Sequence, residues 1–467
     1  MHDDAGYSLE LVRARAQELQ KVSPTFCLAK WTQSTVLLQN GLTHSCHHPA
    51  RHRISQADLV NNPQGLHNTP VKLRARSELL RGKQTPECSY CWNIENLNRG
   101  HISDRIYKST YSWSFPRLEE ILSSGLGQEI APSYLEVSFD STCNAKCLYC
   151  NPESSSSWEA EIRRFGPMSQ VEKPLYDLGD MHKRGALPIP PEEPNPYTEA
   201  FWKWWPEIYQ KLMVLRITGG EPLLSNHTWR LIEEVLASPR RELRFAVNSN
   251  LCIPRSLVTR LVDQINALAG KIHSFEVYTS LESVGTQAEY VRYGMRFDDF
   301  LENCHYVLDH TPPSSRLHFM TTINLLSAPS FLGYLELLRN LRRKYKVSKN
   351  DFRVRTFLNY LRWPQFLSLS LLPQHLKDVY ADEWVEFVKK HLVTASSGDA
   401  VFYEEELDQV ERLVAYMQTC VPEKRDFENF RLFITEIDRR RGLDFVATFP
   451  ELRILLERGY FGELRRK

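Results

Sequence analysis

The chain has 467 residues, of which 25% are charged, and a formal net charge of +1. This balance argues against broad electrostatic binding to nucleic acid or to a membrane surface. No run of about 18 apolar residues predicts a membrane span. The first residues, MHDDAGYSLELVRARAQEL, indicate a charged helix rather than a signal peptide. We therefore expect a soluble, cytoplasmic protein of two or three domains.

The N-terminal part carries four clustered cysteines. Cys27 and Cys46 stand at the ends of a predicted β-hairpin with Asn40-Gly41 at its turn. Cys88 and Cys91 form a close pair in CSYC. In a reducing cytosol such clusters bind metal more often than they form disulfides. The four thiols predict one metal centre, either structural zinc or an iron–sulfur cluster.

Other features of this part are expected to be solvated. His47, His48 and His52 follow the hairpin and could add to the metal ligands, but loop histidines in water are the favoured interpretation. Residues 46–55, CHHPARHRIS, together with residues 72–83, KLRARSELLRGK, are locally basic and could contact nucleic acid or an acidic leader peptide. Without a nucleic-acid motif we predict a solvated basic face and no nucleic-acid partner.

From about residue 133, β-rich runs alternate with amphipathic helices. The predicted strands are 134–139, 212–217, 242–247, 271–279, 316–323 and 351–358, and predicted helices between them are 228–238, 255–269, 296–310 and 331–345. Alternation implies a parallel sheet, and six strands are too few for the closed eight-stranded barrel. We predict an α/β fold with a partial (βα)6 parallel barrel, whose working residues lie at the C-terminal ends of the strands.

Two further segments complete the predicted organisation. A Pro-rich stretch, 186–198, predicts an extended insertion, and the aromatic segment FWKWWPEIY at 201–209 is either helical core or a surface that stacks on substrate. After about residue 370 only helices are predicted, at 382–392, 406–420 and 429–443. The predicted domains are a small cysteine-rich α+β module at 1–130, the barrel at 131–370 and a helical C-terminal extension at 371–467.

Three cysteines follow the first barrel strand, in CNAKCLYCN at 143–151. Cys143, Cys147 and Cys150 can wrap one loop around a small inorganic cluster, and thiolates are the usual iron–sulfur ligands. Three ligands leave one iron of a cubane open, as a catalytic metal site requires. The remaining cysteines, Cys252, Cys304 and Cys420, are predicted to be small buried hydrophobes.

This loop resembles the signature of the radical S-adenosylmethionine (SAM) superfamily, C-x3-C-x2-C with an aromatic residue, here Tyr149, before the last cysteine. The resemblance implies a catalytic [4Fe-4S] cluster that binds SAM. TGGEP, with Thr218, Gly219, Gly220 and Glu221, resembles the family's motif for the amino group of SAM, although such a sequence is also an ordinary turn. NSN, from Asn248, resembles the strand end near the ribose, or is a plain polar turn.

Two later strand ends extend the resemblance. Ser280 in YTSLES and Arg292 in YVRYG are twelve residues apart, as in the sulfatase-maturating branch, where both contact SAM. Glu282 stands where that branch commonly has Asp. The alternative for Arg292 is an exposed helix arginine. Asn324 in TTIN resembles a nucleoside contact, which tertiary contacts would explain equally.

The resemblance covers roughly residues 133 to 360 and implies reductive cleavage of SAM to a 5′-deoxyadenosyl radical that abstracts hydrogen from a substrate. The N-terminal cysteines resemble the twitch and SPASM modules that hold auxiliary [4Fe-4S] clusters, although those modules usually follow the barrel. Such oxidoreductases commonly modify peptides or proteins and take electrons from a flavodoxin or ferredoxin. The alternatives are a small metabolite or nucleotide substrate, and a non-catalytic iron–sulfur or zinc scaffold.

Overall fold

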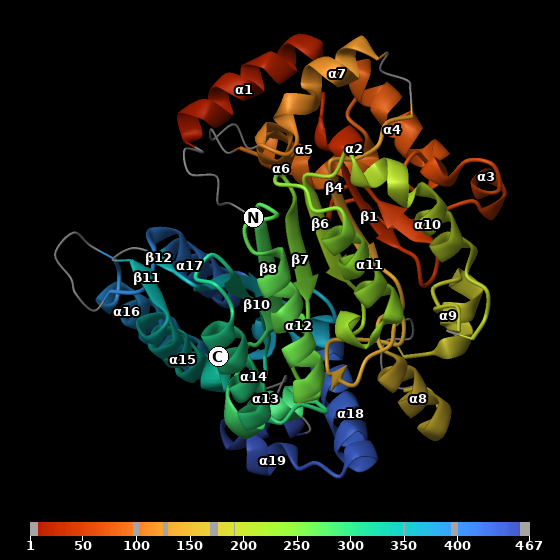
Figure 1. The fold of residues 1–467 in the computed structure, drawn as a ribbon. Coiled ribbons are helices and arrows are strands. Elements are labelled where there is room, and N and C mark those ends of the chain that lie inside the picture. The colour runs from red at the N-terminus through yellow and green to blue at the C-terminus, as the bar shows by residue number, and fades with distance from the viewer. Residues whose placement is uncertain are drawn as a thin grey trace. The chain divides into compact units, whose positions relative to one another are not determined.

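The computed structural model describes residues 8–96, 102–124, 129–168, 176–190, 192–348, 351–393 and 400–457 (Figure 1). The chain divides into two compact units. Unit 1 comprises Met1–Asp140, Pro188–Gly219 and Pro239–Ala246, and unit 2 comprises Ser141–Leu187, Gly220–Ser238 and Val247–Lys467. The division into domains at 1–130, 131–370 and 371–467 stays a prediction. Parts of all three segments, with residue 191 of the Pro-rich stretch among them, lie outside the described residues.

Unit 1 is built on strands in the order β6-β4-β1-β2-β3. Their bounds are Val214–Thr218 for β6, Tyr134–Ser138 for β4, Gln33–Leu37 for β1, Leu42–His44 for β2 and His52–Arg53 for β3. Strands β1 and β2 form the predicted hairpin, in which Leu37 lies opposite Leu42. Strand β1 also runs parallel to β4, with Val36 opposite Val137, so the cysteine hairpin is part of the same sheet as the first predicted barrel strand.

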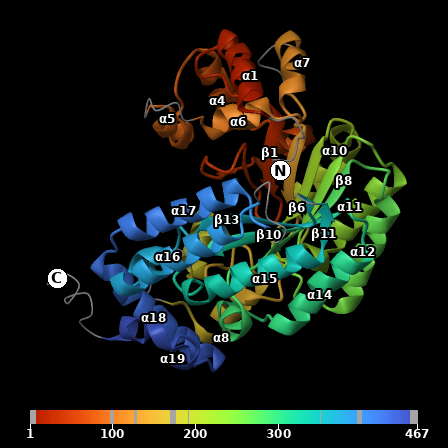
Figure 2. The same cartoon turned by 90° about the vertical axis from the view of Figure 1, so that its left-hand side faces the viewer.

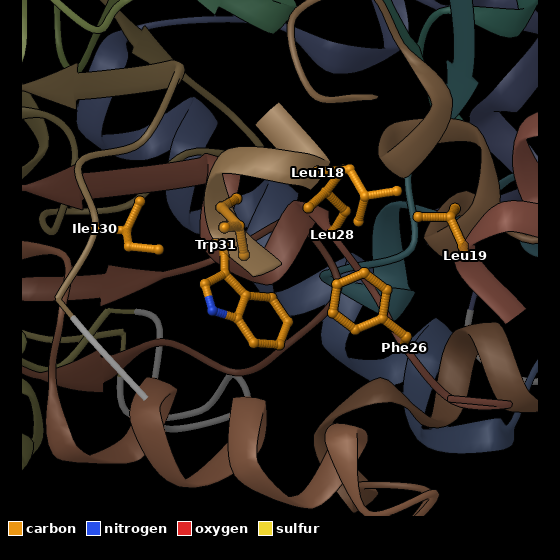
Figure 3. Packing of buried hydrophobic residues seen from close by; sticks show 7 residues of the cluster. Leu19, Phe26, Leu28, Trp31, Leu118 and Ile130 are labelled. Atoms are coloured by element: carbon orange, nitrogen blue, oxygen red, sulfur yellow. The ribbon is translucent and has the colours of Figure 1, made fainter. Parts of the chain in front are cut away.

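The described part of unit 1 also contains eight α-helices. They are α1 (Leu9–Val22), α2 (Ala29–Thr32), α3 (Gln56–Leu59), α4 (Pro70–Leu80), α5 (Ser89–Glu95), α6 (Asp104–Thr110), α7 (Leu118–Ser123) and α10 (Pro196–Tyr209). Apolar side chains from α1, α2, α7 and the segments between them form one cluster, in which Phe26 packs beside Trp31 (Figure 3).

Two sequence predictions for unit 1 are resolved by burial. Helix α10 begins with Asn195 as its side-chain cap and buries Trp204 and Trp205, so the aromatic segment is mainly core. The predicted solvated basic face is wrong at Lys72 and Arg76, which are both buried. The Lys72 ammonium donates to the hydroxyls of Ser34 and Thr43, because a buried cation needs polar partners.

Unit 2 contains three further predicted strands in the order β8-β10-β13, all parallel. They span Ser274–Ser280, Arg316–Ile323 and Val354–Tyr360. Strand β7 (Arg244–Asn248) has residues in both units. All six predicted strands are therefore present in a mixed α/β fold with parallel pairing, while their closure into a partial barrel stays a prediction. Short strands β5 (Lys146–Cys147) and β9 (Arg292–Tyr293) pair antiparallel, as do β11 (Lys346–Ser348) and β12 (Asp351–Phe352).

The helices of unit 2 are α8 (Ser156–Phe165), α9 (Leu178–Arg184), α11 (Asn226–Ala237), α12 (Arg255–Leu268), α13 (Gly285–Val291), α14 (Phe297–His310), α15 (Phe331–Lys344), α16 (Gln374–Lys390), α17 (Glu404–Thr419), α18 (Lys424–Arg441) and α19 (Phe445–Thr448). Among them, α11, α12, α14, α15, α16, α17 and α18 were predicted, whereas α8, α9, α13 and α19 were not. Helices α15, α16 and α17 pack side by side (Figure 2). A buried ion pair between Arg342 and Glu406 joins α15 to α17. In the part of the chain that the structure describes, no helix is both long and apolar enough to cross a bilayer.

Candidate functional site

The loop with Cys143, Cys147 and Cys150 lies in unit 2. Helix α8 follows it and forms hydrogen bonds with its backbone. Ser155 caps that helix by accepting a hydrogen bond from the Trp158 backbone amide, and its hydroxyl donates to the Ala145 carbonyl oxygen at 2.8 Å. The Trp158 indole then donates to the Cys147 carbonyl oxygen at 2.8 Å. The helix cap and the first turn therefore hold the backbone between the first and second thiols.

Two glycines from other segments touch this loop. A Cβ at Gly220 would lie 2.3 Å from the Thr142 carbonyl oxygen, and one at Gly294 would lie 2.6 Å from that of Asn144. Gly294 also has φ of +105°, which disfavours any other residue. Beside Gly220, the Glu221 backbone amide donates to Thr142 at 2.7 Å. The predicted glycine motif thus packs directly against the cysteine loop.

The Glu221 carboxylate is only 1% exposed. It accepts hydrogen bonds from the backbone amides of Asn250, at 2.6 Å, and Leu223, at 3.1 Å. Burial raises the pKa of Glu221 to about 7, although these hydrogen bonds act to lower it. Among the described residues, no Lys, Arg or His side chain forms an ion pair with this carboxylate. An ammonium group would therefore complete the site.

Asn250 links this carboxylate to the cysteine loop, and sequence reasoning missed its role. Its side chain donates to Asn144 Oδ1 at 2.9 Å, while Asn144 donates to the Cys252 carbonyl oxygen at 2.6 Å. The NSN motif contained the signal, but the prediction chose Asn248, the last residue of β7. Cys252 and Cys420 are half-buried, which corrects the prediction of buried hydrophobes, whereas Cys304 is fully buried as predicted.

The structure brings Tyr149, Glu282 and Arg292 together at Cys147. Arg292 pairs with Glu282 at 2.6 Å, and the Tyr149 hydroxyl donates to the same carboxylate at 3.0 Å. Arg292 Nη1 also donates to Cys147 Sγ at 3.7 Å, because the β5-β9 pairing places these residues opposite each other. Arg292 is buried, so the alternative of an exposed helix arginine is wrong.

The other predicted SAM contacts lie at strand ends. Ser280 is the last residue of β8 and lies opposite Met320 of β10. The Asn324 side chain donates to Thr322 and accepts from the Leu326 amide, so its polar atoms stabilise a local turn. Thr218 ends β6, in unit 1.

Burial sets the ionisation of the three thiols. It raises the pKa of Cys143 to about 12 and also raises the pKa values of Cys147 and Cys150. At Cys147 the charges of Arg292 and Arg441 oppose this effect by favouring the thiolate. Because only thiolates bind metal, a metal or these two cations must compensate for the burial.

The four N-terminal cysteines line one cavity within unit 1. Their joint ligation of one metal centre stays a prediction. Burial raises the pKa values of Cys27 and Cys91 to about 12. Four charged side chains also line the cavity, although no local sequence pattern indicated them: Lys30, Asp104, Arg105 and Lys108. His48 lines it too, pairing with Asp104 at 2.8 Å, so the prediction of a solvated loop histidine is wrong there. Within the described ranges, no three His, Cys, Asp or Glu side chains are grouped closely enough for a single metal ion.

Comparisons with known proteins give little beyond this geometry. No protein-family model and no curated protein matches the chain. Among solved structures, SuiB from Streptococcus suis bound to S-adenosylmethionine is 11% identical and has a TM-score of 0.30, with 77% of this chain and 69% of that chain covered. SuiB bound to its precursor peptide SuiA is 11% identical with a TM-score of 0.29, covering 70% and 72%. Likeness at this level assigns no family.

Proposed function

We propose that the chain is a radical SAM enzyme whose catalytic [4Fe-4S] cluster is held by Cys143, Cys147 and Cys150. The observation that carries the proposal is the buried Glu221 carboxylate, which has no cationic partner among the described residues and accepts from the backbone amides of Asn250 and Leu223. The backbone amide of Glu221 itself donates to Thr142, directly before the three-thiol loop. A loop of three thiols fits a cluster with one open iron, and a carboxylate fits the ammonium group of SAM.

The cluster and SAM would supply one-electron cleavage of SAM, giving methionine and a radical that abstracts hydrogen from the substrate. The protein's own residues prepare the site. Gly220 allows the Glu221 backbone to lie against the loop, and Asn250 orients the carboxylate. Arg292 donates to the Cys147 sulfur and is itself held by Glu282. Hydrogen bonds to the sulfurs and nearby charge are the protein's means of setting a cluster's potential.

For the N-terminal cavity we propose an auxiliary [4Fe-4S] cluster held by Cys27, Cys46, Cys88 and Cys91. Four thiols around one cavity fit a cubane, in which each iron takes one cysteine. Full ligation leaves no open iron, which favours electron transfer or a structural role. Structural zinc is the alternative for the same four thiols.

The substrate class follows only from the resemblance to radical SAM enzymes. A peptide or protein substrate is proposed, with a flavodoxin-like or ferredoxin-like electron donor. A small metabolite or nucleotide is the alternative substrate. The competing function is a non-catalytic scaffold that keeps the cysteines for folding.

The test is SAM cleavage by protein that has been reconstituted with iron and sulfide under anaerobic conditions and reduced with dithionite. We expect 5′-deoxyadenosine to accumulate with the wild type and to be absent with Cys143/Cys147/Cys150→Ala. Cys420→Ala is the matched control, because this half-buried thiol lies at the end of α17 outside the site. Protein that holds the cluster and binds SAM but never cleaves it, with candidate substrates present, would favour the scaffold.

A further inference from the structure

The last turn of α18 reaches the cysteine loop from a remote part of the sequence. Arg441 donates from Nη1 to the Lys146 carbonyl oxygen at 3.0 Å, across a separation of 295 residues. This carbonyl belongs to the peptide bond that leads into Cys147. Gly442 ends the helix in the left-handed conformation, with φ of +65°, and so places Arg441 in the final turn.

Arg441 also completes a buried group of charges. Its Nε lies 3.1 Å from Glu161 Oε2, and Lys146 Nζ lies 2.5 Å from the same oxygen. The Arg441 side chain is 0% exposed, and that of Glu161 is 1% exposed. The guanidinium further lies 4.5 Å from the Trp158 ring and 5.0 Å from the Tyr293 ring. Because the Glu161 carboxylate lies between the two cations Lys146 and Arg441, the group has an excess positive charge beside Cys147. This charge would favour a negatively charged, thiolate-bound cluster there.

We propose that Arg441 is a positioning residue for the catalytic cluster, so that the C-terminal helix α18 is part of the metal site. It fixes the Lys146 carbonyl and the Glu161 carboxylate at once, and this holds the backbone between Cys143 and Cys147. The proposal rests on the proposed function in one respect, namely that the loop holds a cluster. Loss of the guanidinium removes the hydrogen bond that holds the Lys146 carbonyl oxygen. It also removes one of the two cations that balance the charge of Glu161.

Hydrogen exchange on the metal-free protein tests the support of the loop directly. We expect Arg441→Met to raise amide exchange in the peptide covering residues 143–151 by at least about tenfold, because the loop then opens more often. This peptide contains the Leu148 amide, which donates to the Val291 carbonyl oxygen at 2.9 Å. Arg439→Met is the matched control. It removes the same charge from the same helix, but Arg439 is 58% exposed and pairs with Glu436.

Exchange in α14, at 297–310, shows whether unit 2 remains folded. Wild-type exchange at 143–151 in folded Arg441→Met protein would overturn the proposal. If Arg441→Met unfolds unit 2 as a whole, Arg441→Lys decides the question. Lysine keeps the positive charge near Glu161. Its ammonium group lacks the planar guanidinium with which Arg441 hydrogen-bonds the Glu161 carboxylate and the Lys146 carbonyl oxygen at the same time. Raised exchange in the loop alone supports the proposal, and unchanged exchange overturns it.

The reconstituted protein gives a second readout. We expect Arg441→Met to lose iron to a chelator at least about tenfold faster than Arg439→Met and to change the EPR spectrum of the reduced cluster, with partial rescue in Arg441→Lys. Iron loss and spectra equal to those of the wild type would contradict a positioning role. If the wild type itself takes up no iron at this loop, the proposed function fails, while the exchange experiment still decides whether Arg441 supports the loop.

Discussion

The Glu221 carboxylate is buried and accepts hydrogen bonds from neutral donors, the backbone amides of Asn250 and Leu223. Its pKa is raised to about 7 by burial. The charged form, which would receive an ammonium group, therefore dominates above pH 7 and is lost as the pH falls through 7. We predict that SAM affinity falls about tenfold for each pH unit below 7.

Equilibrium dialysis of SAM between pH 6 and pH 8, on reconstituted protein, measures this dependence. Glu221→Gln is the control, because it cannot ionise and should bind weakly at every pH in this range. Wild-type affinity that does not change with pH would show that Glu221 does not receive the ammonium group.

Arg292 illustrates what residue patterns predict and what they miss. The twelve-residue spacing from Ser280 and the aromatic Tyr149 before Cys150 were visible in the sequence. The contact between Arg292 and Cys147 was not, because it depends on a pair of two-residue strands that carry no β-signal of their own. Asn250 was missed for a similar reason, since its partner Asn144 is remote in the sequence.

At the scale of elements, the backbone at Gly220 packs directly against the backbone that leads into the cysteine loop. A Cβ at Gly220 would meet the Thr142 carbonyl oxygen at 2.3 Å and that of Ser141 at 2.7 Å, and neither atom belongs to a flexible side chain. We predict that Gly220→Ala displaces the loop and costs about 1–3 kcal/mol. The catalytic cluster should then fail to assemble, which iron analysis and EPR measure.

Gly270→Ala separates this effect from backbone strain. Gly270 has φ of +73° and no atom within 4 Å of a built Cβ, so alanine there costs about 1–2 kcal/mol without touching the loop. Comparable losses in stability, with iron lost in Gly220→Ala and unchanged in Gly270→Ala, would support the packing argument. Normal iron content in Gly220→Ala would contradict it.

The elements themselves were largely predictable, because strand and helix periods are local. All six predicted strands and the later helices α16, α17 and α18 are present. The pairing of β1 with β4 was not predicted, since a short run such as QSTVL does not identify its neighbour in a sheet. The role of Arg441 was equally invisible, because it depends on a contact across 295 residues.

For the whole molecule, the two cysteine groups predict two separable metal centres, one in each unit. After anaerobic reconstitution we expect about eight irons per chain, falling to about four in Cys143/Cys147/Cys150→Ala, since each cubane holds four. About four irons that fall to none, with zinc retained, would instead make the N-terminal centre structural zinc. Iron, acid-labile sulfide and zinc measured on the same samples distinguish these outcomes.

The contact between Arg441 and Lys146 also sets an order of events during synthesis. A ribosome that adds about 5–20 residues per second completes the cysteine loop about 15–60 s before it adds Arg441. During that interval the nascent chain contains the three thiols but not the end of helix α18, which supports their loop. A cluster inserted during this interval would bind a loop that lacks its contacts with Arg441. Assembly factors that act after the chain is released would instead deliver iron to a loop that already has these contacts.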